Sequence, residues 1–256
     1  MKIKLVILIS LIVYSCNIPT EENLKKPNII FMMSDDHTSQ AWGIYGGVLE
    51  KYAINKNIKR LAAEGVVLEN AFCTNSICVP SRASILTGQY SHKNQVYTLT
   101  DALEPDKLNV AKILRKSGYQ TALVGKWHLK KQPSGFDYFN VLPGQGRYNN
   151  PLLKDIHNWE DGNKGGRVFE GFSSDVIMDE SIKWLDQRDK DKPFMLMTHF
   201  KATHEPFDYP DRFKDLFKGE NLPEPESLLD FYPGNSGRTF EGQILEILAE
   251  RWRSAT

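Results

Sequence analysis

The sequence carries no net charge, has little cysteine, and contains no apolar run long enough for a transmembrane helix. Lysine and arginine together number 32, as do aspartate and glutamate, so the whole chain has no field that would attract nucleic acid. Three cysteines are too few for a disulfide framework, and their spacing is not that of a zinc site. Low-complexity tracts are also absent. With five Trp, ten Tyr and thirteen Phe, the composition is that of a globular protein.

The first 16 residues have the pattern of an export signal. Lys2 and Lys4 precede an apolar run that is broken only by Ser10, and the small residue Ser15 stands before Cys16. The segment Val13-Tyr14-Ser15-Cys16 resembles a bacterial lipobox, which implies a lipid anchor at Cys16. Residues 1–16 are therefore predicted to be a signal peptide of the lipoprotein type, followed by a polar tether over residues 17–26. This pattern predicts an exported bacterial protein, either periplasmic or attached to the outer membrane.

Apolar runs and helical periods alternate along the rest of the chain. Strands are expected at residues 28–33, from 66 to 72, and at 119–124 and 193–200; helices are expected at 55–64, 80–87, 108–116, 172–187 and 240–252. Residues 131–171 and 207–240 read as long loops. The alternation predicts an α/β fold with a mainly parallel central sheet and helices on both faces.

Polar side chains follow four of the expected strands. They are Asp35 and Asp36, Cys78, Lys126 with His128, and His204. In open α/β sheets the ligand site lies beyond the carboxyl ends of the strands. The coincidence of four such clusters predicts an active site at this edge of the sheet.

The stretch from Cys78 to Gly88 carries the most specific pattern. Pro80 suits the first turn of a helix, and Gly88 would end that helix. Cys78 would then lie just ahead of the helix N-terminus, where an anion is favoured, with Arg82 close by as a planar donor. A single cysteine in such a place is more often a buried structural residue, the role expected for Cys73.

The complete string resembles the signature of the sulfatase family. It reads Cys78-x-Pro-Ser-Arg82, followed by Leu-Thr-Gly88. The resemblance implies an alkaline-phosphatase-like fold and hydrolysis of sulfate esters. It also implies that a formylglycine-generating or anaerobic sulfatase-maturating enzyme converts Cys78 to formylglycine, whose hydrated aldehyde is the nucleophile.

The same resemblance assigns roles to the other polar clusters. Alone, Asp35-Asp36 would be read as a cap or a turn, but in sulfatases this pair binds calcium together with the formylglycine position, and calcium is expected in preference to magnesium. The segment Gly-Lys126-Trp-His128-Leu matches a second family motif. It implies that Lys126 contacts the sulfate and leaving group and that His128 contacts the formylglycine diol. Both side chains would share one side of an extended segment.

His204 lies in a segment that resembles the one supplying a sulfate-contacting histidine, which makes it a candidate general acid. The family often has proline where this chain has Thr203. His199, inside the preceding strand, is expected to be structural.

The resemblance covers residues 26–249, so residues 27–256 are expected to be the N-terminal part of a sulfatase catalytic domain, incomplete at the C-terminus. The motif that supplies the remaining calcium ligands has no match in the sequence. The expected substrate is a sulfated polysaccharide or glycan. Two alternatives stay open: a phosphodiesterase-like hydrolase of the same superfamily, which would use Ser or Thr as nucleophile, and an inactive truncated lipoprotein that binds glycan.

Overall fold

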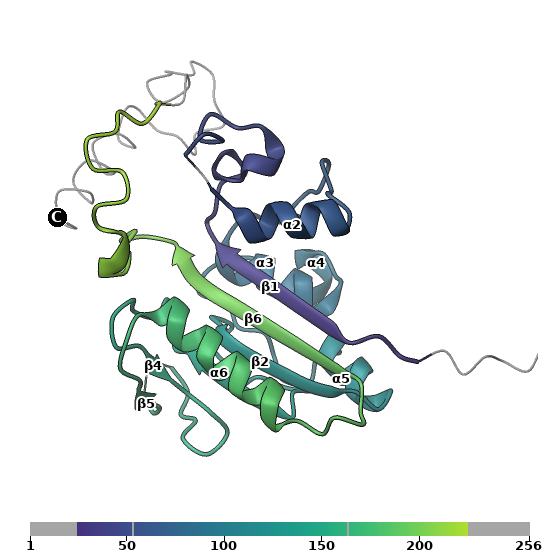
Figure 1. Cartoon of the computed structure of the whole chain (residues 1–256). Coiled ribbons are helices and arrows are strands. Elements are labelled where there is room, and N and C mark those ends of the chain that lie inside the picture. Colours follow the sequence, from purple (N-terminus) through teal and green to yellow (C-terminus); the bar gives the residue numbers. More distant parts are fainter. Residues whose placement is uncertain (1–24, 53, 163, 225–256) are drawn as a thin grey trace, which may run out of the picture.

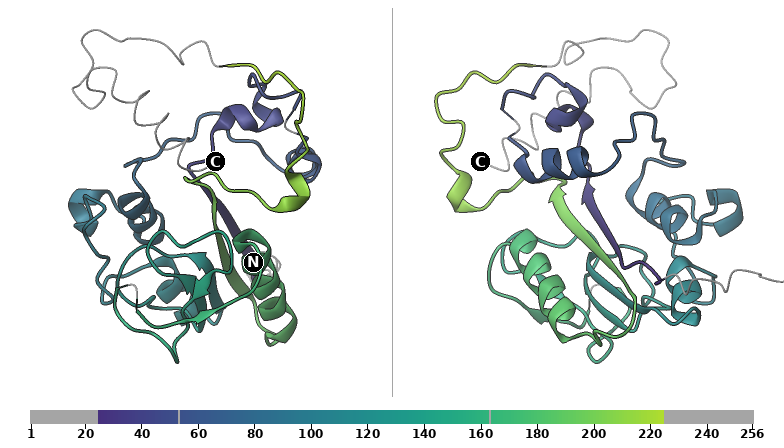
Figure 2. Two further views of the ribbon diagram at one scale, coloured as in Figure 1. Left: turned by 90° about the vertical axis from the view of Figure 1, so that its left-hand side faces the viewer. Right: turned by 45° about the vertical axis from the view of Figure 1, so that its right-hand side comes forward.

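The computed structural model describes residues 25–52, 54–162 and 164–224 (Figures 1 and 2). The expected signal peptide, the lipid-anchor position Cys16 and the helix expected at 240–252 lie outside these residues. Within them, no helix is both long and apolar enough to cross a membrane.

A four-stranded parallel sheet forms the centre of the structure. Its strands are β1 (Ile29–Asp35), β2 (Gln120–Lys126), β3 (Tyr138–Leu142) and β6 (Phe194–Thr203), in the order β1-β6-β2-β3. Figure 1 shows β6 lying between β1 and β2. The strand expected at 119–124 is thus confirmed as β2, and the one at 193–200 as the first part of β6.

Helices cover both faces of the sheet. On one face α6 (Ser173–Gln187) packs through Val176 and Ile177. On the other lie α3 (Cys78–Thr87) and α5 (Val110–Lys116), which bury Ala83 and Ala111 among others. This arrangement confirms the predicted α/β class, and it follows from β2 and β6 being apolar on both sides.

The side chains of the central strands alternate between the two cores. Leu123 of β2 belongs to the core beneath α3 and α5, whereas Ala122 and Val124 belong to the core beneath α6. In β6, Met195 joins the first core and Leu196 the second. This alternation is the period of two that a strand imposes. It fixes the register, and therefore which side chains reach the carboxyl ends of the strands.

The strand expected over residues 66–72 is not formed. The side chains of Val66, Leu68 and Phe72 are exposed by 85%, 67% and 89%. Cys73, expected to be a small buried residue in that strand, is also exposed, and its Sγ lies 3.2 Å from the carbonyl oxygen of Asn75. A strand needs a partner for its backbone groups, and residues 66–72 pair with no strand in the described part of the chain.

The region 131–171 is only partly the loop that was expected. It contains β3, which pairs in parallel with β2, and a short antiparallel pair formed by β4 (Leu152–Leu153) and β5 (Arg167–Val168). Asn140, in the middle of β3, broke the apolar pattern. It is buried and donates from its side-chain amide to Glu180 Oε2 of α6 at 3.0 Å, so the sheet tolerates it.

Five shorter elements complete the described part of the chain. They are η2 (Ser39–Ala41), η3 (Gly43–Tyr45), α2 (Lys56–Glu64), α4 (Ser91–Asn94) and η4 (Asp211–Phe213); α2 confirms the helix expected at 55–64. The segment after β6 returns to the segment after β1, since the Tyr52 and Phe217 rings pack edge to face at 6.3 Å. Figure 2 shows these two segments together above the strand ends.

Candidate active site

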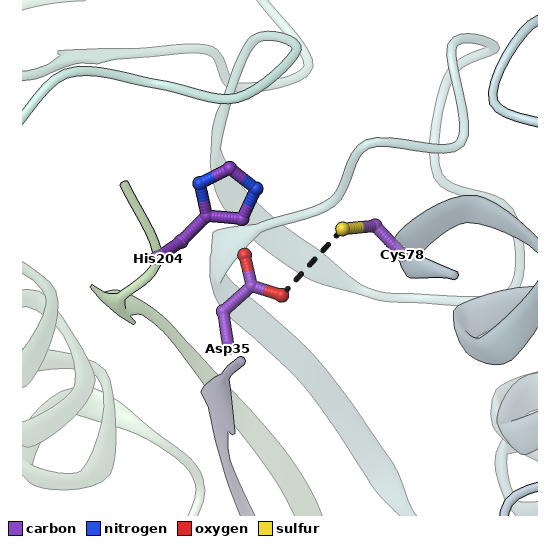
Figure 3. Close-up of side chains that lie close together, drawn as sticks. All are labelled: Asp35, Cys78 and His204. Carbon is purple, nitrogen blue, oxygen red and sulfur yellow. Dashed lines mark hydrogen bonds between the residues drawn. The ribbon is translucent and has the colours of Figure 1, made fainter. Parts of the chain in front are cut away.

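The carboxyl ends of three strands bring the predicted residues together. Asp35 is the last residue of β1, Lys126 is the last of β2, and His204 directly follows β6. One ligand atom from each of Asp35, Cys78 and His204 lies within 4.8 Å of the other two (Figure 3). The predicted location of the site is therefore what the sheet topology produces.

Helix α3 places Cys78 differently from the prediction. The helix begins at Cys78 itself, with Ile77 as its N-cap, so the cysteine lies in the first turn and not ahead of it. The helix ends at Gly88, whose left-handed backbone (φ 64°) confirms the predicted stop. From this position the Cys78 Sγ lies 3.8 Å from Asp35 Oδ1 and 4.0 Å from Lys126 Nζ.

Asp35 is held between two buried cations. Arg82 NH2 lies 3.3 Å from Asp35 Oδ1, and Lys126 Nζ donates to Asp35 Oδ2. Burial raises the pKa of the Asp35 carboxyl, but the Arg82 guanidinium and the Lys126 ammonium outweigh it and hold that pKa below its usual value. Asp35 is consequently ionised at neutral pH.

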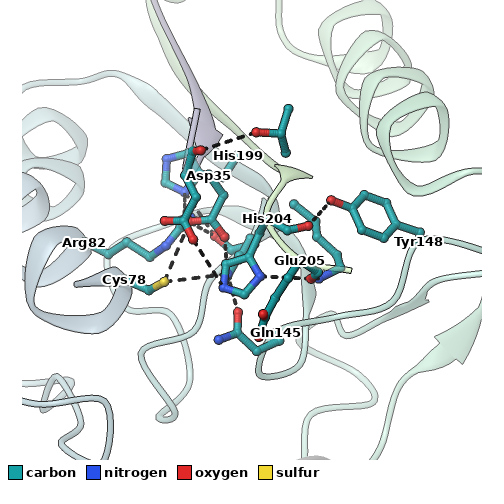
Figure 4. Close-up of polar contacts among 12 residues, drawn as sticks. Asp35, Cys78, Arg82, Gln145, Tyr148, His199, His204 and Glu205 are labelled. Carbon is teal, nitrogen blue, oxygen red and sulfur yellow. Dashed lines mark hydrogen bonds and ion pairs between the residues drawn. The ribbon is translucent and has the colours of Figure 1, made fainter. Parts of the chain in front are cut away.

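The guanidinium of Arg82 is fixed by the backbone of the neighbouring strand. Its NH1 donates to the Lys126 carbonyl oxygen at 2.7 Å and lies 3.3 Å from His199 Nδ1 (Figure 4). His199 is fully buried, and burial together with Arg82 lowers its pKa to about 3. A neutral histidine packed against Arg82 agrees with the structural role predicted for it.

His128 lies near Arg82 and Lys126, but its backbone does not have the extended conformation that was expected. Strand β2 ends at Lys126, and the backbone of His128 is left-handed (φ 60°), so the argument from an extended segment was wrong. Its Nδ1 is buried without a hydrogen-bond partner. Burial, Lys126 and Arg82 lower the pKa of His128 to about 4, and its imidazole is neutral at physiological pH.

The side chains of His204 and Asp36 lie next to each other at the site. His204 is 8% exposed, and its Nε2 lies 3.6 Å from Asp36 Oδ2. The side chain of Asp36 is 58% exposed, in contrast to that of Asp35. The two adjacent carboxylates thus differ: one is enclosed by Arg82 and Lys126, and the other reaches the open side of the site beside His204.

These residues suit calcium only in part as they stand. The carboxylates of Asp35 and Asp36 offer the hard oxygen atoms that calcium prefers, whereas the Cys78 thiol is a ligand for softer metals. Burial also raises the pKa of the Cys78 thiol, because the cationic Lys126 only partly offsets it. With an oxygen in place of that sulfur, residues 35, 36 and 78 would all offer oxygen ligands. They would then supply part of the roughly six to eight oxygen atoms that calcium binds.

Several side chains at the site belong to no motif. Lys126 Nζ also donates to Gln145 Oε1. Gln145, Lys201 and His204 line a cavity of about 410 Å³ that opens beside the site. Tyr148 and His199 complete the group of polar contacts drawn in Figure 4. No local signal in the sequence marks Gln145 or Tyr148, because each reaches the site through the packing of a segment distant from the motifs.

The fold is that of the alkaline-phosphatase-like class. A family model described as Sulfatase matches residues 27–254, and the chain therefore belongs to the sulfatase family.

Among curated proteins, an N-acetylglucosamine-6-O-sulfatase of Bacteroides thetaiotaomicron is 40% identical over 240 residues, which is 93% of this chain and 42% of that protein. The human N-acetylgalactosamine-6-sulfatase is 29% identical over 211 residues, covering 70% of this chain and 40% of its own length. The chain thus spans about two fifths of the length of these relatives.

Solved structures agree with this assignment. A protein determined in complex with its substrate D-glucosamine-2-N,6-O-disulfate superposes with a TM-score of 0.75 at 41% identity, over 82% of this chain and 41% of that chain. The PsFucS1 sulfatase from Pseudoalteromonas sp. superposes with a TM-score of 0.61 at 26% identity, over 75% of this chain and 47% of that chain.

Proposed function

We propose that this chain carries the nucleophile and the sulfate-binding groups of a glycan sulfatase. The observation that carries the proposal is the meeting of Cys78, in its complete signature, with Asp35, Arg82, Lys126 and His204 at the strand ends. A phosphodiesterase of the same superfamily is disfavoured by the cysteine at the nucleophile position.

In this proposal Cys78 is converted to formylglycine, whose hydrated aldehyde supplies an oxygen nucleophile for the sulfur atom of the ester. Asp35 and Asp36, with residue 78, would hold calcium, which when bound supplies positive charge next to the sulfate oxygens. Arg82 and Lys126 add fixed positive charge in a buried setting, where electrostatic stabilisation is strongest. They cannot reorient freely, because the Lys126 carbonyl and Asp35 hold them.

His128 and His204 carry out different proton transfers in this proposal. Neutral His128 can accept a proton from a hydroxyl group on residue 78, since its pKa of about 4 keeps it unprotonated at neutral pH. His204 presents Nε2 to the open side of the site, and the cationic form of its ring is the proposed donor of the Nε2 proton to the departing sugar oxygen. The sulfur–oxygen bond of the ester breaks, and the sugar alcohol leaves with that proton.

We propose as substrate a glucosamine residue with a sulfate ester at O6. Support comes from the names of two relatives: one is an N-acetylglucosamine-6-O-sulfatase, and the other was solved with D-glucosamine-2-N,6-O-disulfate. The cavity beside His204, lined also by Phe207 and Gln145, has room for a sugar ring. The sequence pattern of residues 1–16 leads us to propose export and a lipid anchor at Cys16, so that the site would meet glycans outside the cytoplasm.

The test uses the protein made from its complete gene together with a sulfatase-maturating enzyme. Mass spectrometry of the peptide containing Cys78 should show the aldehyde, and the protein should release sulfate from N-acetylglucosamine 6-sulfate. Cys78→Ala should abolish release, while Cys73→Ala, which changes an exposed thiol, should leave it intact. An unmodified Cys78 thiol under these conditions would remove the proposal.

A further inference from the structure

The turn that carries His204 is held by the side chains of Tyr148 and Lys201. Tyr148 Oη donates to the His204 carbonyl oxygen, and Lys201 Nζ donates to the Glu205 carbonyl oxygen at 3.0 Å. These carbonyls belong to consecutive residues, so the two donors fix the backbone immediately at and after the histidine. Figure 4 shows Tyr148 approaching this turn from the side opposite Cys78.

The Glu205 carbonyl also sets the state of the imidazole. His204 Nδ1 lies 3.0 Å from that oxygen. A carbonyl oxygen can only accept, so this contact assigns the hydrogen to Nδ1. Nε2 is then the ring nitrogen that faces the site and takes the second proton when the ring is cationic, and it points toward Asp36 at 3.6 Å. The position of one backbone oxygen therefore decides which nitrogen of His204 is available for chemistry.

The two holding side chains are themselves confined. Lys201 is 2% exposed, and its Nζ lies 4.7 Å from the centre of the Tyr148 ring, a favourable cation–π contact. Tyr148 is 3% exposed and stacks on Phe172, with ring centres 5.3 Å apart. Tyr148 precedes β4 and Lys201 belongs to β6, so the pair joins two segments that are distant in the sequence behind the His204 turn.

We propose that Tyr148 and Lys201 are positioning residues, which hold the His204–Glu205 backbone so that Nε2 faces the oxygen of the leaving group. The proposal rests on the proposed function for its catalytic consequence, though not for the state of the ring. Neither residue touches the sulfate in this role. Their loss should therefore weaken protonation of a poor leaving group and leave sulfate binding nearly unchanged.

The test compares Tyr148→Phe and Lys201→Met in the matured protein with two matched controls. Tyr138→Phe removes a hydroxyl group that donates to Glu180 at 3.3 Å. Lys154→Met removes a fully buried lysine that donates to the carbonyls of Glu160 and Gly162 and lies 4.8 Å from the centre of the Trp159 ring. Both controls lie outside the site, so they report the cost of losing comparable contacts elsewhere.

Two substrates separate positioning from general damage. N-acetylglucosamine 6-sulfate releases an alkoxide that needs a proton, whereas 4-nitrophenyl sulfate releases a stable phenolate. We expect kcat on the sugar sulfate to fall roughly 10- to 100-fold in the two test variants, which is part of the roughly 100- to 10,000-fold that a general acid contributes. KM should stay nearly constant in Tyr148→Phe, because Tyr148, unlike Lys201, does not line the proposed sugar cavity. The fall on the aryl sulfate should be at most about threefold, and the controls should change neither rate appreciably. Equal losses on both substrates, or equal losses in the controls, would overturn the proposal.

A second readout does not depend on activity. Nitrogen-15 NMR of histidine-labelled protein distinguishes the two neutral forms of the ring, and the His204 signal can be assigned from a His204→Gln spectrum. The wild type should show hydrogen on Nδ1, and the test variants should show a mixture of both forms. An unchanged His204 signal in both variants refutes the positioning role. A shifted signal in a protein that hydrolyses neither sulfate supports positioning and removes the proposed function.

Discussion

Lys126 is the most enclosed charged residue at the site. Its side chain has no solvent exposure and lies against Asp35, which is itself 6% exposed. Burying a charge is unfavourable unless a partner of opposite charge is close. The two residues therefore depend on each other, and their pairing couples the integrity of the fold to the integrity of the site.

Replacing Lys126 by methionine should destabilise the folded protein strongly. Asp35 would remain buried with Arg82 as its cation, and breaking one partner of a buried pair costs about 3–5 kcal/mol. Lys131→Met is the control, because its ion pair with Asp161 is exposed on both sides (42% and 60%) and is screened by water. Denaturant unfolding of both variants in metal-free buffer measures the difference. Equal losses would show that Lys126 and Asp35 do not stabilise each other.

His199 should make the folded state sensitive to acid. Burial and Arg82 depress its pKa to about 3, whereas a histidine in the unfolded chain titrates near 6.5. Between these values the unfolded chain binds a proton that the folded one does not. The free energy of unfolding therefore falls as the pH drops from about 6.5 toward 3, by about 1.4 kcal/mol per pH unit for each such proton.

The measurement is the free energy of unfolding as a function of pH. His199→Gln should flatten the curve between about pH 6.5 and 4, while the exposed His92 changed to glutamine should leave the slope as it is. His128, with a pKa of about 4, retains a similar contribution in both variants. A slope unchanged by His199→Gln would mean that this residue is protonated in the folded protein.

At the scale of elements, the contact between β2 and β6 depends on Gly125. Its backbone has φ +101°, and a Cβ placed there would lie 1.9 Å from the His199 carbonyl oxygen. Only glycine allows the strands to approach so closely. This approach places Lys126 at the end of β2 next to His199 and Arg82, so one glycine sets the spacing of three groups at the site.

Gly125→Ala should accordingly destabilise the protein by about 3 kcal/mol or more, because the strands must separate to admit the methyl group. Gly46 provides the control: its φ is also positive (+66°), but nothing lies within 4 Å of an added Cβ. Gly46→Ala should lower the free energy of unfolding by only about 1–2 kcal/mol, which is the cost of a left-handed backbone for a residue with a Cβ. Thermal unfolding of the two variants tests the difference, and similar melting temperatures would contradict the argument.

The elements also show what could be inferred from the sequence. Strands β2 and β6 were predictable because continuous apolar runs are buried on both faces. Strand β3 was missed because the polar Asn140 interrupts it, and the side-chain amide of that residue donates to Glu180 of α6, which is distant in the sequence. Residues 66–72 have the composition of a strand but lack a partner in the described structure, which no local pattern reveals.

The residues of the site also differ in whether a local sequence pattern could predict them. Cys78, Arg82, Lys126 and His204 stand in specific motifs and were found from their order along the chain. Tyr148 and Gln145 reach the site only because the 131–171 region folds back onto the strand ends. Their side chains are ordinary in sequence, and nonlocal packing alone gives them a role.

At the scale of the whole molecule, β1 forms one side of the described sheet. It pairs with β6 and with no other strand in the described part of the chain. On one of its faces Ile30 and Met32 are exposed by 55% and 54%. An edge strand with an exposed apolar face is a template for association with another chain.

The 256-residue chain produced alone should therefore associate as its concentration rises. Met32→Lys should reduce association, because a charge on the exposed face of an outer strand opposes pairing. Leu61→Lys, at a position of α2 that is 56% exposed, should have no such effect. Sedimentation velocity over a range of concentrations distinguishes the two. If both variants reduced association equally, the effect would reflect general solubility and not pairing through β1.

The strand order has a consequence for how the chain folds. Among the four described strands of the sheet, β6 is the last to be synthesised, yet it lies between β1 and β2; the Phe194 backbone N–H donates to Asn28 Oδ1 across 166 residues. Closing so long a loop before any pairing is gained makes such topologies slow to fold. Until residues 194–203 have been synthesised, β1 lacks its partner strand β6. Asp35 and His204 therefore cannot come together at the N-terminus of α3, where Cys78 lies. The cysteine should therefore stay accessible to other proteins until residues 194–203 have been synthesised.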